Sequence, residues 1–125
     1  MPVFISPYEC RCRCCRPTCD AEPIDQEAFA KMVAVRTEWD KPIIFTSIRR
    51  CKYYNAKVGG KPDSRHLFGK AFDAWMTDRN EIEALAALAI KYGAGGIGKG
   101  KRLLHMDWRP IPPGGSVAEW EYTDK

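Results

Sequence analysis

Apolar residues recur at a roughly helical period in two stretches of the chain, and each stretch predicts a helix with one buried face. The first helix is expected to begin at Asp25, a residue type that caps helix N-termini, and to end before Asp40. The second is expected to begin at Thr77 or Asp78 and to continue through Tyr92. Both apolar faces are interpreted as core packing rather than as part of a site.

Other stretches have the length and pattern of strands. Residues 43–46 and the apolar run 71–76 are short enough to be core strands. Residues 103–109 alternate, with Leu104, Met106 and Trp108 on one face and Leu103, His105, Asp107 and Arg109 on the other. The second face is interpreted either as a solvated surface or as a row of functional groups about 6.6 Å apart. The glycine-rich stretch 95–101 is expected to form a hairpin leading into this strand, and Trp120 and Tyr122 are expected to lie on a last edge segment.

Composition and charge narrow the class of protein. The 125 residues are 45% hydrophobic and 29% charged, which is typical of one globular domain over residues 1–125. The net charge of +4 comes from basic clusters at 11–16, 49–52 and 99–102. No aromatic and basic RNA motif or helix-turn-helix pattern accompanies them, so we expect no nucleic-acid partner. No stretch has the length of a membrane span, so we expect no membrane partner, and we expect a monomer.

His66, Asp73 and His105 are candidate metal ligands, and the chain contains only two histidines. Two nitrogens and one oxygen are the ligands of a catalytic zinc that keeps one position open. A continuous helix would separate His66 from Asp73 by roughly 10.5 Å, whereas donors on one zinc lie about 3 to 4 Å apart. Gly69 allows the chain to fold back between them. The alternative is that Asp73 only caps or pairs with a cation and that His66 is exposed.

Four segments in order resemble the signatures of the M15 zinc peptidases. They are Thr46 to Asn55, Val58-Gly59-Gly60, Ser64 to Asp73, and Gly96-Ile97-Gly98 followed by His105-Met106-Asp107. The chain is most similar to a compact subgroup with a His-x-Asp ending, found among phage and bacterial cell-wall enzymes. The resemblance covers residues 43–109. It implies an α+β fold with a small antiparallel sheet flanked by helices, of the hedgehog and D-Ala-D-Ala peptidase type.

The resemblance also implies roles for particular residues. Zinc would be held by His66, Asp73 and His105, and Arg50 would bind a carboxylate of a peptidoglycan stem peptide in a two-pronged hydrogen bond. The other expected substrate-binding residues are Ser47, Asn55 and Ser64, with Ser64 beside the metal. The implied activity is that of a carboxypeptidase or endopeptidase, as in an endolysin or another phage or prophage cell-wall enzyme.

The sequence departs from the family pattern in two places. Residues 99–104 contain no acid, although many relatives have an acid or a histidine there. We therefore expect Asp107 to be the general base, with the alternative that it orients a ligand. Ile48 replaces the usual glycine after Ser47. The missing acid also supports a second hypothesis, that the protein binds metal and cell wall, or is part of a virion, without efficient turnover.

The start of the chain has no basic end followed by an apolar core, and we therefore expect no signal peptide. A cell-wall enzyme of this kind would be made in the cytoplasm and would reach its substrate through lysis or virion association. The positive clusters would favour approach to anionic wall polymers.

Five of the six cysteines lie in an N-terminal arm at about residues 8–20, between Cys10 and Cys19, and the sixth is Cys51. Four of them are candidates for a second, structural zinc ion, although Cys-x-x-Cys spacing occurs only at Cys12 and Cys15. Disulfides, including one to Cys51, and reduced thiols are the other interpretations. A small metal-binding or redox protein dominated by this arm is a further alternative.

Overall fold

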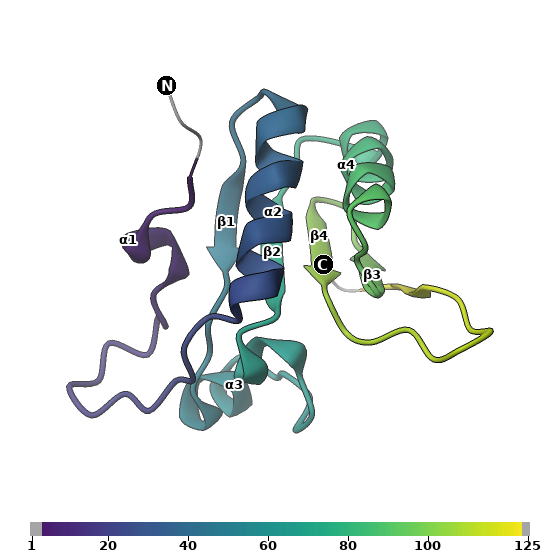
Figure 1. Ribbon diagram of the computed structural model, residues 1–125. Helices are drawn as coiled ribbons and strands as arrows, with labels where there is room; N and C mark the ends of the chain where they lie inside the picture. The colour runs from purple at the N-terminus through teal and green to yellow at the C-terminus, as the bar shows by residue number, and fades with distance from the viewer. Residues whose placement is uncertain (1–3, 124–125) are drawn as a thin grey trace.

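The computed structural model describes residues 4–123. A five-stranded sheet with strand order β1-β2-β4-β3-β5 forms its centre (Figure 1). The elements are α1 (Pro7–Cys10), α2 (Gln26–Trp39), β1 (Ile44–Ser47), α3 (Lys52–Lys57), the 3-10 helix η1 (Arg65–Phe68), β2 (Ala71–Trp75), α4 (Arg79–Lys91), β3 (Gly96–Lys99), β4 (Leu103–Asp107) and β5 (Ala118–Glu121). The α+β class expected from the sequence is confirmed.

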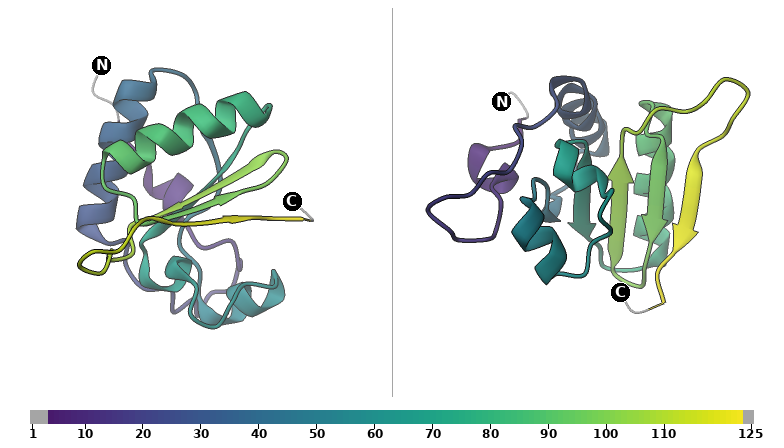
Figure 2. Two further views of the ribbon diagram at one scale, coloured as in Figure 1. Left: turned by 90° about the vertical axis from the view of Figure 1, so that its right-hand side faces the viewer. Right: turned by 90° about the horizontal axis from the view of Figure 1, so that it is seen from below.

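The two long helices lie on the same side of the sheet, and α3 lies on the other side (Figure 2). Asp25 caps α2 by accepting a hydrogen bond from Ala28 N at 2.9 Å, and Asp78 caps α4 by accepting one from Glu81 N at 2.9 Å. Asp40 ends α2 in the left-handed conformation. Both helices therefore begin and end close to where the sequence pattern places them.

The sheet is antiparallel at three of its four pairings. β2 pairs with both β1 and β4, and β4 also pairs with β3 in the expected hairpin. The sheet is mostly antiparallel, as predicted, and it differs from the prediction only at the outer edge, where β3 and β5 are parallel. The tail leaves β4 and returns through a long loop before it pairs, so it enters the sheet in the same direction as β3 (Figure 2).

The core lies between the helices and the sheet. Phe72, Leu104, Met106 and Ile97 are fully buried there, together with Met32 and Val35 of α2 and Ile82, Leu85 and Ala89 of α4. The polar face of β4 is not a solvated surface, because His105 is 6% exposed and Asp107 is 0% exposed. Both faces of β4 are thus buried, and the polar one carries the candidate site.

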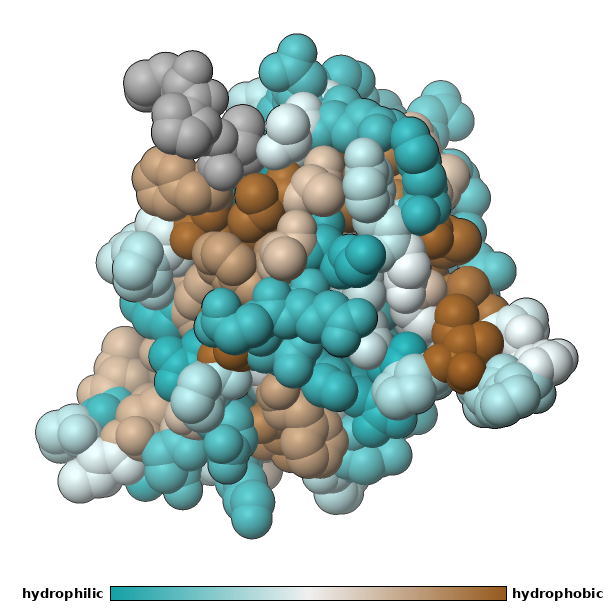
Figure 3. Space-filling view, in the orientation of Figure 1, coloured by the Kyte–Doolittle hydropathy of each residue, from teal (hydrophilic) through white to brown (hydrophobic). Residues whose placement is uncertain are grey.

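Surface side chains are mixed in character. In the space-filling view of Figure 3, polar residues cover much of the visible face, and apolar residues gather in separate patches. Within residues 4–123, no helix combines the length and the apolar character that crossing a membrane requires.

Candidate metal centre

The structure brings His66, Asp73 and His105 together around one point. Asp73 Oδ1 lies 3.1 Å from His66 Nε2 and 2.9 Å from His105 Nδ1. One donor atom from each residue lies within 4.8 Å of the other two, and all three side chains are buried. The set therefore has the size and chemistry of a site for a single divalent cation.

Each of these residues is positioned by a local feature of the chain. Asp73 and His105 are directly paired in register on the neighbouring strands β2 and β4. His66 lies on η1, which Ser64 caps by accepting a hydrogen bond from His66 N at 3.3 Å. Gly69 ends η1 with a φ of +68° and turns the chain into β2. The reversal at Gly69 that the sequence predicts is present, and it places His66 above Asp73.

The tautomer of His66 follows from its partner. Its Nδ1 lies 2.6 Å from Ile48 O, and a carbonyl only accepts, so Nδ1 carries the proton and donates it. In the neutral ring Nε2 is then an acceptor, and it faces a carboxylate oxygen of Asp73. This buried Nε2 has no hydrogen-bond partner among residues 4–123. Two facing acceptors repel each other unless a cation or a proton lies between them, and zinc binding would satisfy both.

His105 presents its other nitrogen to the same point. Its Nε2 lies 2.7 Å from Asp107 Oδ2, while its Nδ1 faces Asp73. Burial raises the pKa of Asp107, but hydrogen bonds from Arg109 and His105 outweigh it and hold that pKa well below its ordinary value. The Asp107 carboxylate therefore accepts a hydrogen bond from His105 Nε2–H and leaves Nδ1 available to act as a ligand. Many zinc sites orient a histidine through a carboxylate in this way.

Arg50 donates a hydrogen bond to the second carboxylate oxygen of Asp73. It donates from Nη2 to Asp73 Oδ2 at 3.0 Å, from Nε to Ser47 Oγ at 2.9 Å and from Nη1 to Asn55 Oδ1 at 3.3 Å. Burial raises the pKa of Asp73, but His66 and His105 beside it lower the pKa well below its ordinary value. Ser47 and Asn55, which the sequence suggests as substrate contacts, hold the Arg50 side chain in this structure.

Sequence reasoning did not assign three groups that shape the site. Arg109 binds Asp107 with two nitrogens, at 2.8 and 2.7 Å. The Trp120 ring lies 5.3 Å from the His105 ring, and the carbonyl of Ile48 fixes His66. Of these three groups, only Arg109 could have been found from the sequence, because it follows His105 and Asp107 at two-residue spacing on one strand face. A backbone carbonyl has no signature in a sequence.

Comparison with known proteins identifies the family to which the chain belongs. The profile of the Peptidase M15 family matches residues 5–107, a segment that contains every residue of the metal centre described above except Arg109 and Trp120. A search of curated proteins found no match. The profile covers well over half of the chain and agrees with the resemblance seen in its motifs. The chain therefore belongs to the M15 family of zinc-dependent peptidases.

Proposed function

We propose that this protein is a zinc peptidase that cleaves the stem peptides of peptidoglycan, with the ion held by His66, Asp73 and His105. The observation that carries the proposal is the pair of imidazole nitrogens that face one buried carboxylate oxygen at 3.1 and 2.9 Å. Zinc bound there would polarise the scissile carbonyl and lower the pKa of water towards about 7.

Asp107 is better suited to orient His105 than to move protons. Its side chain is fully buried, and its two oxygens accept hydrogen bonds from His105 and Arg109. A general base has to reach the proton that it removes. The contacts thus favour the second of the two roles considered for Asp107, in which the carboxylate fixes the tautomer and direction of a metal ligand.

Arg50 retains capacity for the substrate. A guanidinium has five N–H donors, and three of those of Arg50 are used by residues within 4–123. Its side chain is 11% exposed, so part of it remains accessible. We infer that Arg50 fixes Asp73 through one side of its fork and binds a carboxylate of the stem peptide through the other. Ser64 caps η1 beneath His66 and acts on the site through that helix turn.

The chemistry of peptidoglycan suits this arrangement. Stem peptides carry free carboxylates for Arg50, and the wall's anionic polymers would attract a chain with a net charge of +4. We propose a monomeric cell-wall-degrading enzyme of phage or prophage type, acting as an endopeptidase or a carboxypeptidase on a D,D or L,D bond.

A second candidate is a metal-binding module without efficient turnover. It is favoured by the absence of an acid in residues 99–104 and by the engagement of both Asp107 oxygens. Such a protein would bind zinc and cell wall, or form part of a virion, and would release no fragments.

Muropeptides of defined stem length distinguish the two candidates. The purified protein is incubated with each type, with and without a chelator, and the products are identified by mass spectrometry. Metal-dependent fragments support the peptidase, and their masses identify the bond that is cut. Bound zinc without fragments from any stem type would contradict it and favour the module. A His105→Ala variant serves as the control for contaminating hydrolases.

A further inference from the structure

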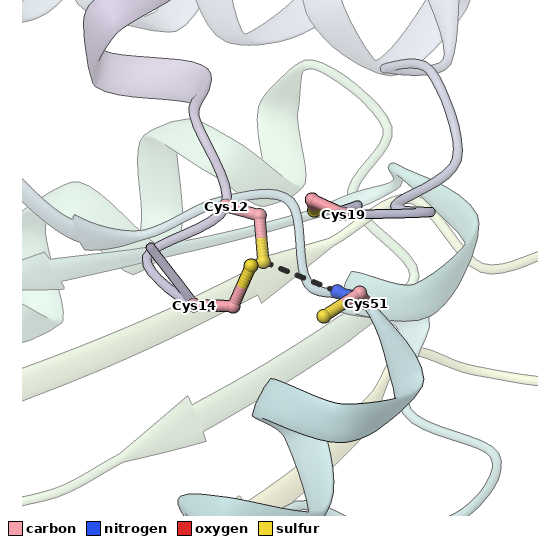
Figure 4. A group of neighbouring side chains, drawn as sticks. All are labelled: Cys12, Cys14, Cys19 and Cys51. Atoms are coloured by element: carbon pink, nitrogen blue, oxygen red, sulfur yellow. Dashed lines mark hydrogen bonds between the residues drawn. The ribbon is translucent and has the colours of Figure 1, made fainter. Parts of the chain in front are cut away.

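Four cysteines from distant parts of the chain converge outside the candidate active site. Their sulfur atoms all lie within 4.8 Å of one another, and the residues are Cys12, Cys14, Cys19 and Cys51. Figure 4 shows three of them on the N-terminal arm and Cys51 at the start of α3. This set differs from the Cys-x-x-Cys pair that the sequence suggests. Cys15 is exposed, with its thiol directed to Arg13 O at 3.7 Å, and Cys10 is buried in the hydrophobic core.

From this convergence we infer that the protein carries a second metal site, a structural zinc bound by these four cysteines. Zinc–sulfur bonds of about 2.3 Å place the sulfurs of a tetrahedral site about 3.8 Å apart. Two disulfides would instead require sulfur pairs at about 2.05 Å. All six cysteines, which lie within residues 4–123, are free thiols in the structure. Thiolates in a tetrahedral set are characteristic ligands of zinc or iron, and the thiols would release their protons to solvent on binding.

Backbone donors support the assignment independently of sulfur spacing. Cys51 N donates to Cys12 Sγ at 3.3 Å, Arg16 N donates to Cys14 Sγ at 3.4 Å, and Tyr54 N donates to Cys51 Sγ at 3.4 Å. Such N–H groups stabilise the negative charge of metal-bound thiolates and fix their direction. The fold therefore supplies a backbone N–H donor to the sulfur of three of the four proposed ligands.

Positive residues lie close to the proposed ligands in the sequence. Arg11, Arg13 and Arg16 alternate with the cysteines, and Arg49 precedes Cys51 by two positions. Arg13 donates to Phe45 O at 3.2 Å, and Arg49 donates to Glu22 O at 2.8 Å and to Ala21 O at 3.0 Å. Four thiolates and one zinc carry a net charge of −2, and these neighbouring positive residues would favour the thiolate form.

The site would hold the arm in place. Residues 11–25 contain no helix or strand, so ordering them costs conformational entropy that local structure does not offset. Binding one ion through three arm cysteines and Cys51 would fasten this segment to the start of α3. Cys51 directly follows Arg50, whose backbone N–H donates to His66 O at 3.3 Å. The cysteine site would thus fix the segment that presents Arg50 to Asp73. Only this last link rests on the proposed function.

Metal content of the reduced, purified chain tests the inference. We expect two zinc ions per chain in the parent and one in the double variant Cys14→Ser with Cys19→Ser. The matched control Cys15→Ser, which alters an exposed thiol of the same arm, should retain two. His105→Ala should lose the other ion and keep the cysteine-bound one. A parent with one zinc that survives in the double variant overturns the inference and leaves the proposed function standing. If the parent binds a single zinc and the double variant loses it, the inference stands and the proposed function is contradicted.

Two measurements on the parent keep the test independent of whether the variants fold. Cobalt(II) in place of zinc should produce thiolate-to-metal charge-transfer absorption, which a site of two histidines and one aspartate cannot give. Its absence at full loading overturns the inference, as does iron in place of zinc in the purified chain. The intact mass of the unreduced, denatured protein should equal that of six thiols. A mass lower by two hydrogens for each bond would show disulfides in place of the metal site.

Discussion

At the scale of single residues, the negative charge of Asp107 favours the His105 tautomer with its proton on Nε2. The Asp107 carboxylate stays ionised because Arg109 and His105 donate to it, and its pKa is held well below the ordinary value despite burial. An ionised acceptor at His105 Nε2 keeps the proton on that nitrogen. His105 Nδ1, the nitrogen that faces Asp73, then remains available to a metal ion.

Replacing Asp107 by Asn should separate the two roles considered for this residue. The amide keeps the shape but removes the charge, so we expect zinc affinity to fall about 10-fold to 100-fold, with activity partly restored by added zinc. Titration with a zinc indicator and peptidase assays at rising zinc concentrations measure both effects. Loss of about 10²-fold to 10⁴-fold in kcat at unchanged zinc affinity would instead support a general base. Asp63→Asn, at an exposed position, serves as the control.

The three proposed ligands could be predicted from the sequence, but the contacts around them could not. A chain with two histidines offers few ways to assemble a zinc site, and Gly69 marked the turn that such a site needs. By contrast, the bond from Arg50 to Asp73 joins positions 23 residues apart and has no local pattern. Contacts of this kind depend on strand register, which only the folded chain fixes.

At the scale of elements, the turn after η1 connects the metal site to the start of α2. Gly69 has a φ of +68°, and its carbonyl accepts a hydrogen bond from Asp25 N at 2.9 Å. A Cβ added there would lie 2.4 Å from Pro23 O and 2.9 Å from Ile24 Cα. The backbone before α2 therefore leaves room only for glycine.

Gly69→Ala should destabilise the fold by about 2–4 kcal/mol, because strain at positive φ is added to a clash with backbone atoms. Urea unfolding measures the change, and zinc retention shows whether His66 has moved. Gly59→Ala is a matched control, since Gly59 has a φ of +75° but no atom within 4 Å of the added Cβ. We expect it to cost about 1 kcal/mol. Equal effects at the two positions would contradict the proposed clash.

The arm is also attached at its first helix. Glu9 of α1 accepts hydrogen bonds from Arg36 of α2 at 3.0 and 2.8 Å. Burial raises the pKa of Glu9, but Arg36 and Ser6 outweigh this effect and lower it below the ordinary value of 4.5. The pair therefore stabilises the folded state fully above about pH 4.5, and the contribution is lost as the pH falls through the lowered pKa.

Glu9→Gln should lower the free energy of unfolding by about 1–2 kcal/mol at pH 7, and the difference from the parent should shrink as the solution is acidified below about pH 4.5. Unfolding curves collected across this pH range measure both quantities. Glu81→Gln, which removes a more exposed pair with Lys41, should change the stability by less than about 0.5 kcal/mol. A difference at Glu9 that does not depend on pH would contradict an ionic contribution.

The strand β3 shows why some elements were harder to predict than the long helices. Its sequence, Gly96-Ile97-Gly98-Lys99, resembles a loop by composition, and only its place in a hairpin was expected. A Cβ at Gly96 would lie 2.5 Å from Asp107 Oδ1, and one at Gly98 would lie 2.5 Å from Trp120 Nε1. These glycines leave space for side chains of the site, so their identity reflects tertiary packing instead of a turn.

At the scale of the whole molecule, the C-terminal tail packs against a site whose proposed ligands lie on other elements. Residues after 107 fall outside the family match, yet β5 adds a parallel edge to the sheet beside β3. Trp120 on this strand lies 5.3 Å from the ring of His105, and the guanidinium of Arg109 lies 5.0 Å from the Trp120 ring. The edge segment expected to carry Trp120 thus packs against the candidate site itself.

Replacing Trp120 by Ala should loosen the metal site more than it weakens the fold. The indole packs on His105, Arg109 and the space above Gly98, so its loss should cost about 1–3 kcal/mol and admit water beside the ligands. We expect faster zinc release to a chelator, and the colour change of an indicator measures the rate. Trp120→Phe keeps a ring against His105 and should release zinc close to the parent rate. Trp75→Ala is a control, because it removes an indole that is 41% exposed at the end of β2. If Trp120→Ala releases zinc no faster than Trp75→Ala, the tail does not support the site.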